Sequence, residues 1–224
     1  MYHRCWNAKL GLLADTPTQD SYSQHTNIFG VLTNAIPLPE QASVIRQLIA
    51  TQLGHDADAG TKMAMVSYHY QFYLSQAIDK SGLGQSYLGT LGPWHTMLDL
   101  GLTTTPEYAD PTRSDTHAWS AHPIYHLLTI VAGIHPAAPG FAAVRIAPMP
   151  GSLQKFDATM PHPNGAIRVQ YNRDGPWAEF VITLPDNLRG YLEWNGKRHT
   201  LHNGRQTFRL HAALQRPASV LSAR

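Results

Sequence analysis

The sequence predicts helices and β-strands in separate domains: a helical domain over residues 1–137 and a small antiparallel β-sandwich domain over residues 138–224. Two observations predict this division. Apolar residues recur at helical spacing in the first part, and they alternate with polar residues in the second. Prolines and glycines accumulate where the pattern changes: Pro136, Pro139, Gly140, Pro148, Pro150 and Gly151.

About five helices are expected in the first part. Pro39 and Glu40 suit the first turn of a helix over residues 39–53, because proline fits at that position and an acid there faces the positive end of the helix dipole. The apolar stripe of this helix is Val44, Ile45, Leu48, Ile49 and Leu53. The other expected helices cover residues 24–34, 62–80, 86–100 and 119–132.

The segment over residues 62–80 is apolar on more than one side, which predicts a helix buried between neighbours. Ser81 and Gly82 are expected to end it. Gly92 and Pro93 interrupt the helix over residues 86–100, and Gly133 closes the last helix.

The second part alternates with a period of two. Ile167, Val169 and Tyr171 share one strand face, and Phe180, Ile182 and Leu184 share another. Asn-Gly pairs occur at 195–196 and 203–204, and such pairs favour tight hairpin turns because both positions tolerate positive φ. The sequence therefore predicts about five to seven short strands.

Composition excludes some classes of function. Charged residues make up 14% of the chain, the formal net charge is +2, and no Lys/Arg cluster occurs, so neither nucleic acid nor a membrane surface is an expected partner. No apolar run is long enough to span a bilayer. The N-terminal residues do not resemble a signal peptide. The cellular compartment stays open. Cys5 is the single cysteine, which excludes an intrachain disulfide.

One glutamate stands apart from the other three. Glu40, Glu179 and Glu193 fit a helix first turn or outward strand positions, whereas Glu107 follows a helix end in a loop rich in hydroxyl groups. A histidine and tryptophans are close by in the sequence. A carboxylate can activate water, an imidazole can bind a sugar hydroxyl and an indole can cover a sugar ring. A polar surface loop without chemistry explains the same residues.

Other candidates are weaker. His69 lies on an apolar helical face and is expected in the core or at its rim. His122 and His126 are one helical turn apart, as metal ligands can be, but no acid or cysteine partner is near, so no metal and no cofactor are expected. Asp56 and Asp58 are expected to be solvated turn residues.

Three segments carry a family resemblance. The stretch from Leu91 to Gly151, which contains LGLTTTPEYADPTRSDTHAWSAHP, resembles the bacterial α-L-rhamnosidase family. SYSQHTNIFGVL and YHYQFYLSQAI are similar to helices of its catalytic domain, and GAIRVQYNRDGPWAEFVITLP onward is similar to its C-terminal β-domain.

The resemblance implies an (α/α)6 barrel and inverting hydrolysis of terminal α-L-rhamnosides. Inversion uses an acid and a base set roughly 6.5–9.5 Å apart, with a water between them. Glu107 matches the family's general base, and His117 matches a histidine of the sugar pocket. Trp94 and Trp119 match aromatic positions of the same motifs.

The resemblance covers only the C-terminal part of the family. The predicted helices make a partial barrel, and the acid-rich motif that supplies the general acid is absent from this sequence. The missing N-terminal part of the barrel is expected in cis or in trans, and a truncated sequence is the favoured explanation. The expected ligand is a rhamnose-containing glycoside or polysaccharide.

Two alternatives to a hydrolase remain. The chain could bind carbohydrate without catalysis, or it could be an inactive remnant that lacks the general acid. Trp177 and Trp194 discriminate between these alternatives: exposure on one sheet face would favour binding, and burial would favour packing.

Overall fold

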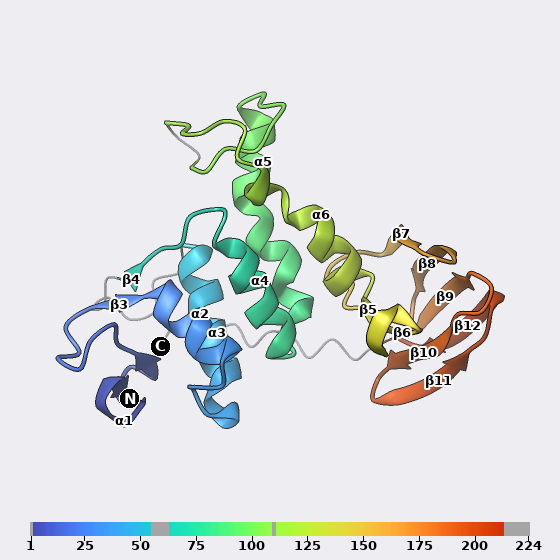
Figure 1. The fold of residues 1–224 in the computed structure, drawn as a ribbon, viewed down its shortest axis with the longest axis horizontal. Coiled ribbons are helices and arrows are strands. Elements are labelled where there is room, and N and C mark those ends of the chain that lie inside the picture. Colours follow the sequence, from blue (N-terminus) through green and yellow to red (C-terminus); the bar gives the residue numbers. More distant parts are fainter. Residues whose placement is uncertain (1, 55–62, 109–110, 213–224) are drawn as a thin grey trace. The chain divides into compact units, whose positions relative to one another are not determined.

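The computed structural model describes residues 2–54, 63–108 and 111–212 (Figure 1). The chain divides into two compact units, Met1–His126 and Leu127–Arg224. These units are defined by compactness, so the domain boundary expected between residues 137 and 138 stays a prediction. Asp56 and Asp58 lie outside the described residues.

The first unit is mainly helical. Its elements are α1 (Tyr2–Cys5), β1 (Trp6–Asn7), β2 (Leu12–Leu13), β3 (Tyr22–Ser23), α2 (Gln24–Leu32), α3 (Leu38–Gln52), β4 (Met63–Ala64), α4 (Gln71–Lys80), η1 (Gly84–Leu91), α5 (Gly92–Asp99), η2 (Ala118–Ala121) and α6 (Pro123–His126). Two short pairs, β1–β2 and β3–β4, accompany the helices. No helix in the described ranges is long and apolar enough to cross a membrane.

Local chemistry sets the helix ends. Ser23 caps α2 by accepting a hydrogen bond from the Thr26 backbone N–H at 3.2 Å. Pro39 and Glu40 lie in the first turn of α3, as predicted. Gly82 follows α4 with a φ of +69°, a value that glycine adopts without strain.

The predicted helix over residues 62–80 is wrong in its first half. Lys62 lies outside the described residues, residues 63–64 form β4, and α4 begins at Gln71. Strand β4 pairs with β3, and the buried Gln24 side chain accepts the Val66 backbone N–H at 3.0 Å. These partners outside the segment replace the hydrogen bonds that a helix would supply.

The expected helices over residues 86–100 and 119–132 are divided. Pro93 lies at the start of α5, and the 3₁₀-helix η1 precedes it. The later segment consists of η2, α6 and η3 (Leu127–Val131), where η3 is a π-helix. Proline favours a helix start because it fixes φ and has no N–H to leave unpaired.

The second unit contains two four-stranded sheets. One has the order β11-β10-β6-β5 and the other β12-β9-β8-β7. Their strands are β5 (Ile134–Pro136), β6 (Ala143–Ile146), β7 (Lys155–His162), β8 (Gly165–Asp174), β9 (Trp177–Leu184), β10 (Arg189–Trp194), β11 (Lys197–Leu201) and β12 (Gly204–His211). All pairs are antiparallel except β6–β10. The expected separate α and β regions are therefore confirmed.

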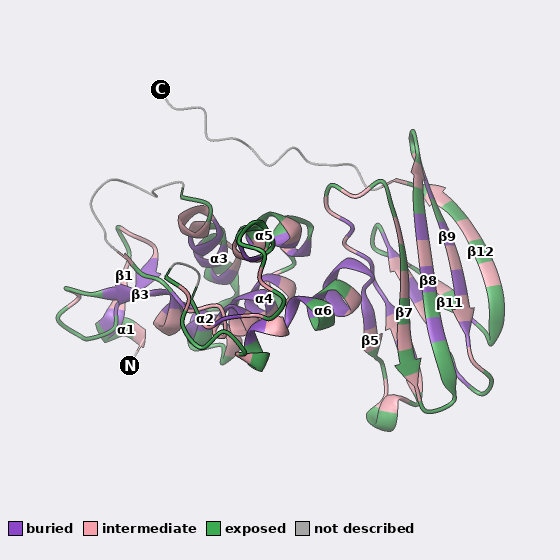
Figure 2. Cartoon of the chain, turned by 90° about the horizontal axis from the view of Figure 1, so that it is seen from above, coloured by how far each residue is buried: buried purple, intermediate pink, exposed green. Residues whose placement is uncertain are grey.

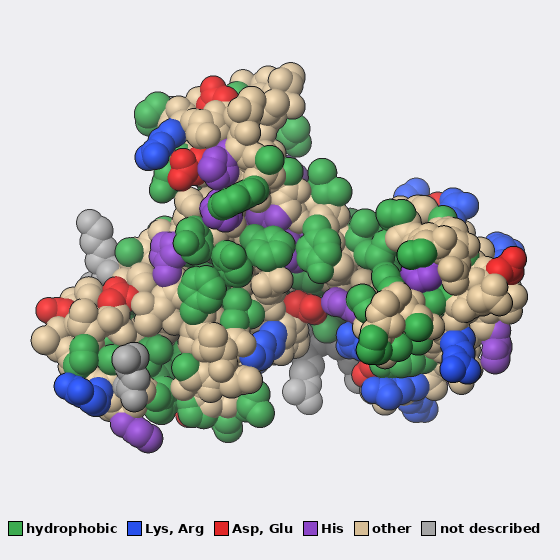
Figure 3. All heavy atoms as spheres, in the orientation of Figure 1, with side chains coloured by type: hydrophobic (Ala, Val, Ile, Leu, Met, Phe, Trp, Pro, Cys, Tyr) green, Lys and Arg blue, Asp and Glu red, His purple; other side chains and the backbone are tan. Residues whose placement is uncertain are grey.

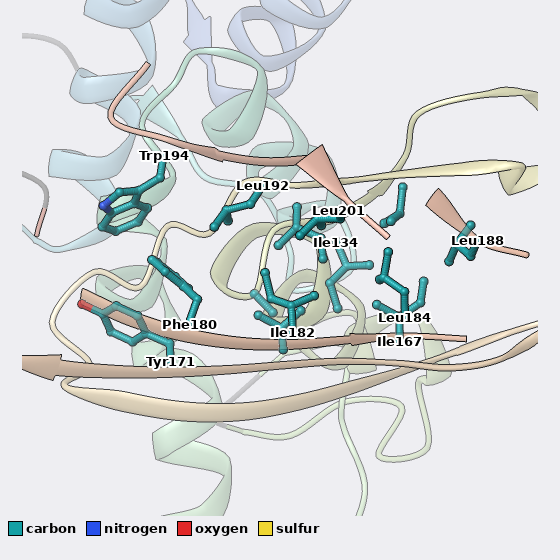
Figure 4. Packing of buried hydrophobic residues seen from close by; sticks show 14 of the residues in the cluster. Ile134, Ile167, Tyr171, Phe180, Ile182, Leu184, Leu188, Leu192, Trp194 and Leu201 are labelled. Carbon is teal, nitrogen blue, oxygen red and sulfur yellow. The ribbon is translucent and has the colours of Figure 1, made fainter. Parts of the chain in front are cut away.

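Side chains from both sheets form one core (Figure 4). Ile167, Val169 and Tyr171 are buried on β8, as predicted from their period-two spacing. Figure 2 shows the same alternation of buried and exposed residues along the strands. The predicted faces of β8 and β9 are thus confirmed.

The two tryptophans of this unit do not share an exposed face. Trp194 is in the core, packs against Phe180 and donates its indole N–H to the His211 carbonyl at 2.7 Å. Trp177 stacks on His211 with ring centroids 4.3 Å apart. This arrangement favours packing over a two-tryptophan carbohydrate platform.

One of the two predicted hairpins is wrong. Asn195 and Gly196 have positive φ and connect the paired strands β10 and β11. Asn203 and Gly204 connect β11 to β12, but β12 pairs with β9 in the other sheet. The second turn therefore moves the chain between sheets and does not close a hairpin.

Candidate functional site

A loop closed by backbone hydrogen bonds, called the pinned loop below, carries Glu107 and His117, the two principal site candidates. Between α5 and η2, the Glu107 backbone N–H donates to the Arg113 carbonyl at 2.9 Å, and the His117 N–H donates to the Thr105 carbonyl at 2.7 Å. The Thr105 hydroxyl also donates to the His117 carbonyl at 3.0 Å. These bonds hold the two arms of the loop together and bring Glu107 near His117.

The Glu107 carboxylate is partly shielded. Its side chain is 22% exposed, and its Oε2 atom is 3.4 Å from Nε of the exposed Arg113. Its charge also raises the pKa of His69 against the larger effects that lower it. Glu107 therefore lies within electrostatic range of a histidine from a distant part of the sequence.

His117 has one paired and one unpaired ring nitrogen. Its Nδ1 is 3.2 Å from the Ser114 hydroxyl. Its Nε2 is buried and has no hydrogen-bond partner among the described residues. Buried polar atoms are usually paired, so an unpaired ring nitrogen at this position suits a ligand hydroxyl.

The two predicted tryptophans occupy different environments. Trp119 is 65% exposed, and its ring centroid is 4.2 Å from that of His69. Trp94 donates its indole N–H to the Ser120 carbonyl at 2.7 Å and contacts Tyr68 and His122 with its ring. The structure brings Glu107, His117 and Trp119 together around His69. The catalytic role expected of Glu107 and the substrate-binding roles expected of His117, Trp94 and Trp119 stay predictions.

An open cavity of about 460 Å³ adjoins this cluster. Figure 3 shows hydrophobic and histidine side chains gathered on this face of the helical unit. The cavity is lined by His69, Phe72, Tyr73, Ala118, Trp119, Ala121, His122 and Tyr125. Aromatic walls with a few polar groups are typical of sites that bind a ring-shaped ligand.

His69 is the site residue that sequence reasoning did not select. It lies at the cavity, where its ring contacts those of His117 and Trp119. Burial, and then the nearby His117, lower the pKa of His69. The only sequence signal was its place between two tyrosines, which indicated an apolar helical face.

Two further histidines are buried beside the cavity. Nδ1 of His122 is 3.1 Å from Nδ1 of His126, and Nε2 of His122 is 3.1 Å from the Tyr68 carbonyl oxygen. Burial lowers the pKa of His122 to about 4, partly opposed by the Tyr68 carbonyl. Burial and the neighbouring His122 lower the pKa of His126 to about 3. Both rings are therefore neutral at pH 7.

The buried pair predicts acid sensitivity of the helical unit. In the unfolded chain the two rings bind protons below a pKa of about 6.5, whereas the folded chain keeps them neutral to lower pH. Protons therefore favour unfolding, and the free energy of unfolding should fall by roughly 2 kcal/mol per pH unit between pH 6 and pH 5. Urea unfolding followed by circular dichroism at each pH measures this slope.

A matched pair of variants checks the assignment. His126→Asn should remove about half of that slope, because one of two titrating rings is gone. The His95→Gln variant changes an exposed residue of α5 and should leave the slope unchanged. A slope that is equal in all three proteins would contradict the prediction.

The described residues contain no group of three or more histidine, cysteine, aspartate or glutamate side chains placed to hold a metal ion. Within the helical unit, the His122–His126 pair makes a direct ring-to-ring hydrogen bond.

Solved structures share this fold. An α-L-rhamnosidase from Aspergillus terreus matches with a TM-score of 0.72 and 18% identity, covering 93% of this chain and 26% of that chain. A GH78 family rhamnosidase of Bacillus sp. GL1 matches with a TM-score of 0.67 and 22% identity, covering 84% and 21%. A Streptomyces avermitilis α-L-rhamnosidase complexed with L-rhamnose matches with a TM-score of 0.61 and 17% identity, covering 84% and 20%.

These matches define the class: the chain has the fold of part of a glycoside hydrolase, and it spans about a quarter or less of the length of those structures. Residues 133–209 match the model of the bacterial alpha-L-rhamnosidase C-terminal domain. The predicted resemblance to the C-terminal part of the bacterial α-L-rhamnosidase family is therefore confirmed. A comparison with curated protein sequences gives no match.

Proposed function

We propose that the chain is the C-terminal part of an inverting α-L-rhamnosidase, with Glu107 as the general base. The observation that carries the proposal is the pinned loop, which holds Glu107 and His117 next to the aromatic cavity. In this role Glu107 removes a proton from the water that attacks the sugar. In the same proposal Trp119 covers the sugar ring and His117 binds its hydroxyls.

The general acid of this reaction comes from outside the chain. Inverting hydrolysis needs a protonated carboxyl group across the sugar from the base. Among the acidic residues described in the helical unit, Glu107 is the one whose charge acts on His69 at the cavity. A second carboxyl group from the missing part of the barrel therefore completes the pair.

Exposed apolar side chains support an incomplete barrel. Ten of the eleven exposed large hydrophobic side chains of the described residues lie in the first unit. They are Phe29, Leu38, Leu53, Met65, Leu98, Leu100, Tyr108, Trp119, Ile124 and Tyr125. Soluble proteins usually cover large apolar patches or use them for binding. We therefore propose that the helices of this chain are part of an (α/α)6 barrel, and that the missing helices, in cis or in trans, cover this surface.

Hydrolysis of an aryl α-L-rhamnoside tests the proposal. The chain joined to its upstream sequence should release the aryl group with inversion at the anomeric carbon, and residues 1–224 alone should show little or no turnover. The matching aryl β-D-glucoside is the control substrate. Full activity of residues 1–224 would contradict the external general acid, and inactivity of the longer form would contradict the rhamnosidase function.

Carbohydrate binding without catalysis is the alternative function. The exposed Trp119 beside the aromatic cavity favours it for the isolated chain. Titration of residues 1–224 with L-rhamnose, followed by tryptophan fluorescence, measures such binding. Binding by a longer form that has no turnover would favour this alternative over the hydrolase.

A further inference from the structure

The buried histidine pair has no role in the proposed chemistry. His122 and His126 are 8% and 1% exposed, yet their Nδ1 atoms are only 3.1 Å apart. Apolar and aromatic rings surround them, including Phe72 of α4 and Tyr87 of η1. Burying polar groups costs free energy unless they are hydrogen-bonded, and here the two rings bond to each other and to the Tyr68 carbonyl.

The hydrogen bonds fix the proton positions on both rings. A backbone carbonyl can only accept, so Nε2 of His122 carries the proton that bonds to Tyr68. A neutral ring has one N–H, so Nδ1 of His122 is an acceptor. Nδ1 of His126 must then carry the proton between the rings. Nε2 of His126 is left as an acceptor, and it is buried with no hydrogen-bond partner among the described residues.

The pair joins elements that carry the candidate site. His122 binds the carbonyl of Tyr68, the residue before His69. The same imidazole makes a T-shaped contact with Trp94 of α5, with centroids 5.0 Å apart and planes at 81°. Trp94 in turn donates to the Ser120 carbonyl of η2, one residue after Trp119. One neutral imidazole therefore connects the segment before α4 to α5 and η2.

We propose that His122 and His126 are a positioning pair with fixed proton positions, which holds the cavity wall in place and releases it when Nδ1 of His122 is protonated. A proton added to Nδ1 of His122 would place two donors 3.1 Å apart, so one ring would have to turn away. A proton added to Nε2 of His126 would place a charge among aromatic rings but would leave both hydrogen bonds of the pair intact. The protonation that breaks the pair is therefore the one at Nδ1 of His122.

The surrounding groups oppose such protonation. The titratable groups that face the pair are Tyr68 and His69 ahead of α4, Tyr87 of η1 and Tyr125 of α6. The segment from α5 contributes Trp94, which does not titrate. The charge of His69 acts against protonation of His122. The proton order depends on these contacts alone and not on the proposed rhamnosidase function.

Nuclear magnetic resonance of the ¹⁵N-histidine-labelled chain tests the proposal directly. Two-bond ¹H–¹⁵N correlations distinguish the two neutral tautomers and the charged ring. At pH 7, His122 should be protonated at Nε2 and His126 at Nδ1, and both patterns should persist to pH 5.5. Opposite tautomers, or a ring that titrates like free imidazole near pH 6.5, would overturn the proposal.

Two variants of His126 separate the hydrogen bond from packing. His126→Asn can still donate to His122, so His122 should keep its Nε2–H pattern. His126→Leu fills similar space without a donor, so Nδ1 of His122 loses its partner and becomes free to bind a proton, while Nε2 still donates to the Tyr68 carbonyl. His122 should therefore be protonated at higher pH in His126→Leu than in His126→Asn; equal titration of His122 in the two variants would refute the positioning role, and the wild-type spectra decide the proton order even if the leucine variant does not fold.

Discussion

Glu107→Gln in the longer, active form is expected to reduce kcat by about 10²- to 10⁴-fold, with KM nearly unchanged. Glutamine keeps the size of the side chain and an oxygen that can accept from Arg113, 3.4 Å from the native carboxylate. It cannot take a proton from water. The loss therefore falls on the chemical step and not on the shape of the loop. Steady-state hydrolysis of an aryl α-L-rhamnoside measures both constants.

The control for this variant is Glu179→Gln. Glu179 is an exposed residue of β9, so the same chemical change there should leave kcat and KM unaltered. Equal activity of Glu107→Gln and the unmodified longer form would show that another residue is the base. A large rise in KM with normal kcat would indicate a binding role for Glu107.

Gly133→Ala is expected to destabilise the β-unit by more than about 4 kcal/mol, which is beyond the usual range for a single substitution. Gly133 has a φ of +69°, and a Cβ atom there would lie 2.1 Å from the Ala147 carbonyl carbon and 2.2 Å from its oxygen. The Gly133 carbonyl also accepts the Ala147 N–H at 2.8 Å. Backbone atoms of both residues would have to separate. Denaturant unfolding followed by near-ultraviolet circular dichroism measures the change.

Gly196→Ala isolates the cause of this effect. Gly196 has a φ of +73°, close to that of Gly133, but a Cβ there would meet no atom within 4 Å. Its cost should be limited to the conformational strain, about 1–2 kcal/mol. The difference between the variants then measures the backbone contact alone. Similar losses for both variants would show that positive φ, and not the contact, requires glycine at 133.

Local patterns predicted the strand faces but not all strand partners. The alternation in β8 and β9 determines which side chains enter the core, and the buried Ile167 and Phe180 agree with it. The Asn195–Gly196 and Asn203–Gly204 pairs have the same turn chemistry, yet only the first closes a hairpin. Pairing of β12 with β9 depends on residues far away in the sequence, which no local pattern encodes.

The site was predictable where its residues are close in sequence. Glu107, His117 and Trp119 come from one stretch, and the loop hydrogen bonds bring the first two together. His69 comes from a segment whose helical start was predicted too early. Because β4 and the Val66–Gln24 bond divert that segment from helix, the position of His69 follows from tertiary contacts.

The unequal distribution of exposed apolar side chains has a consequence for sequence variation. In the second unit, Leu127 is the one exposed large hydrophobic side chain among the described residues. The outward positions of that unit should therefore tolerate any residue that keeps the protein soluble. Leu98 and Ile124 are exposed in the helical unit. If missing helices cover them, these positions are core positions of the whole protein, and related sequences should restrict them to apolar residues as strictly as Val44.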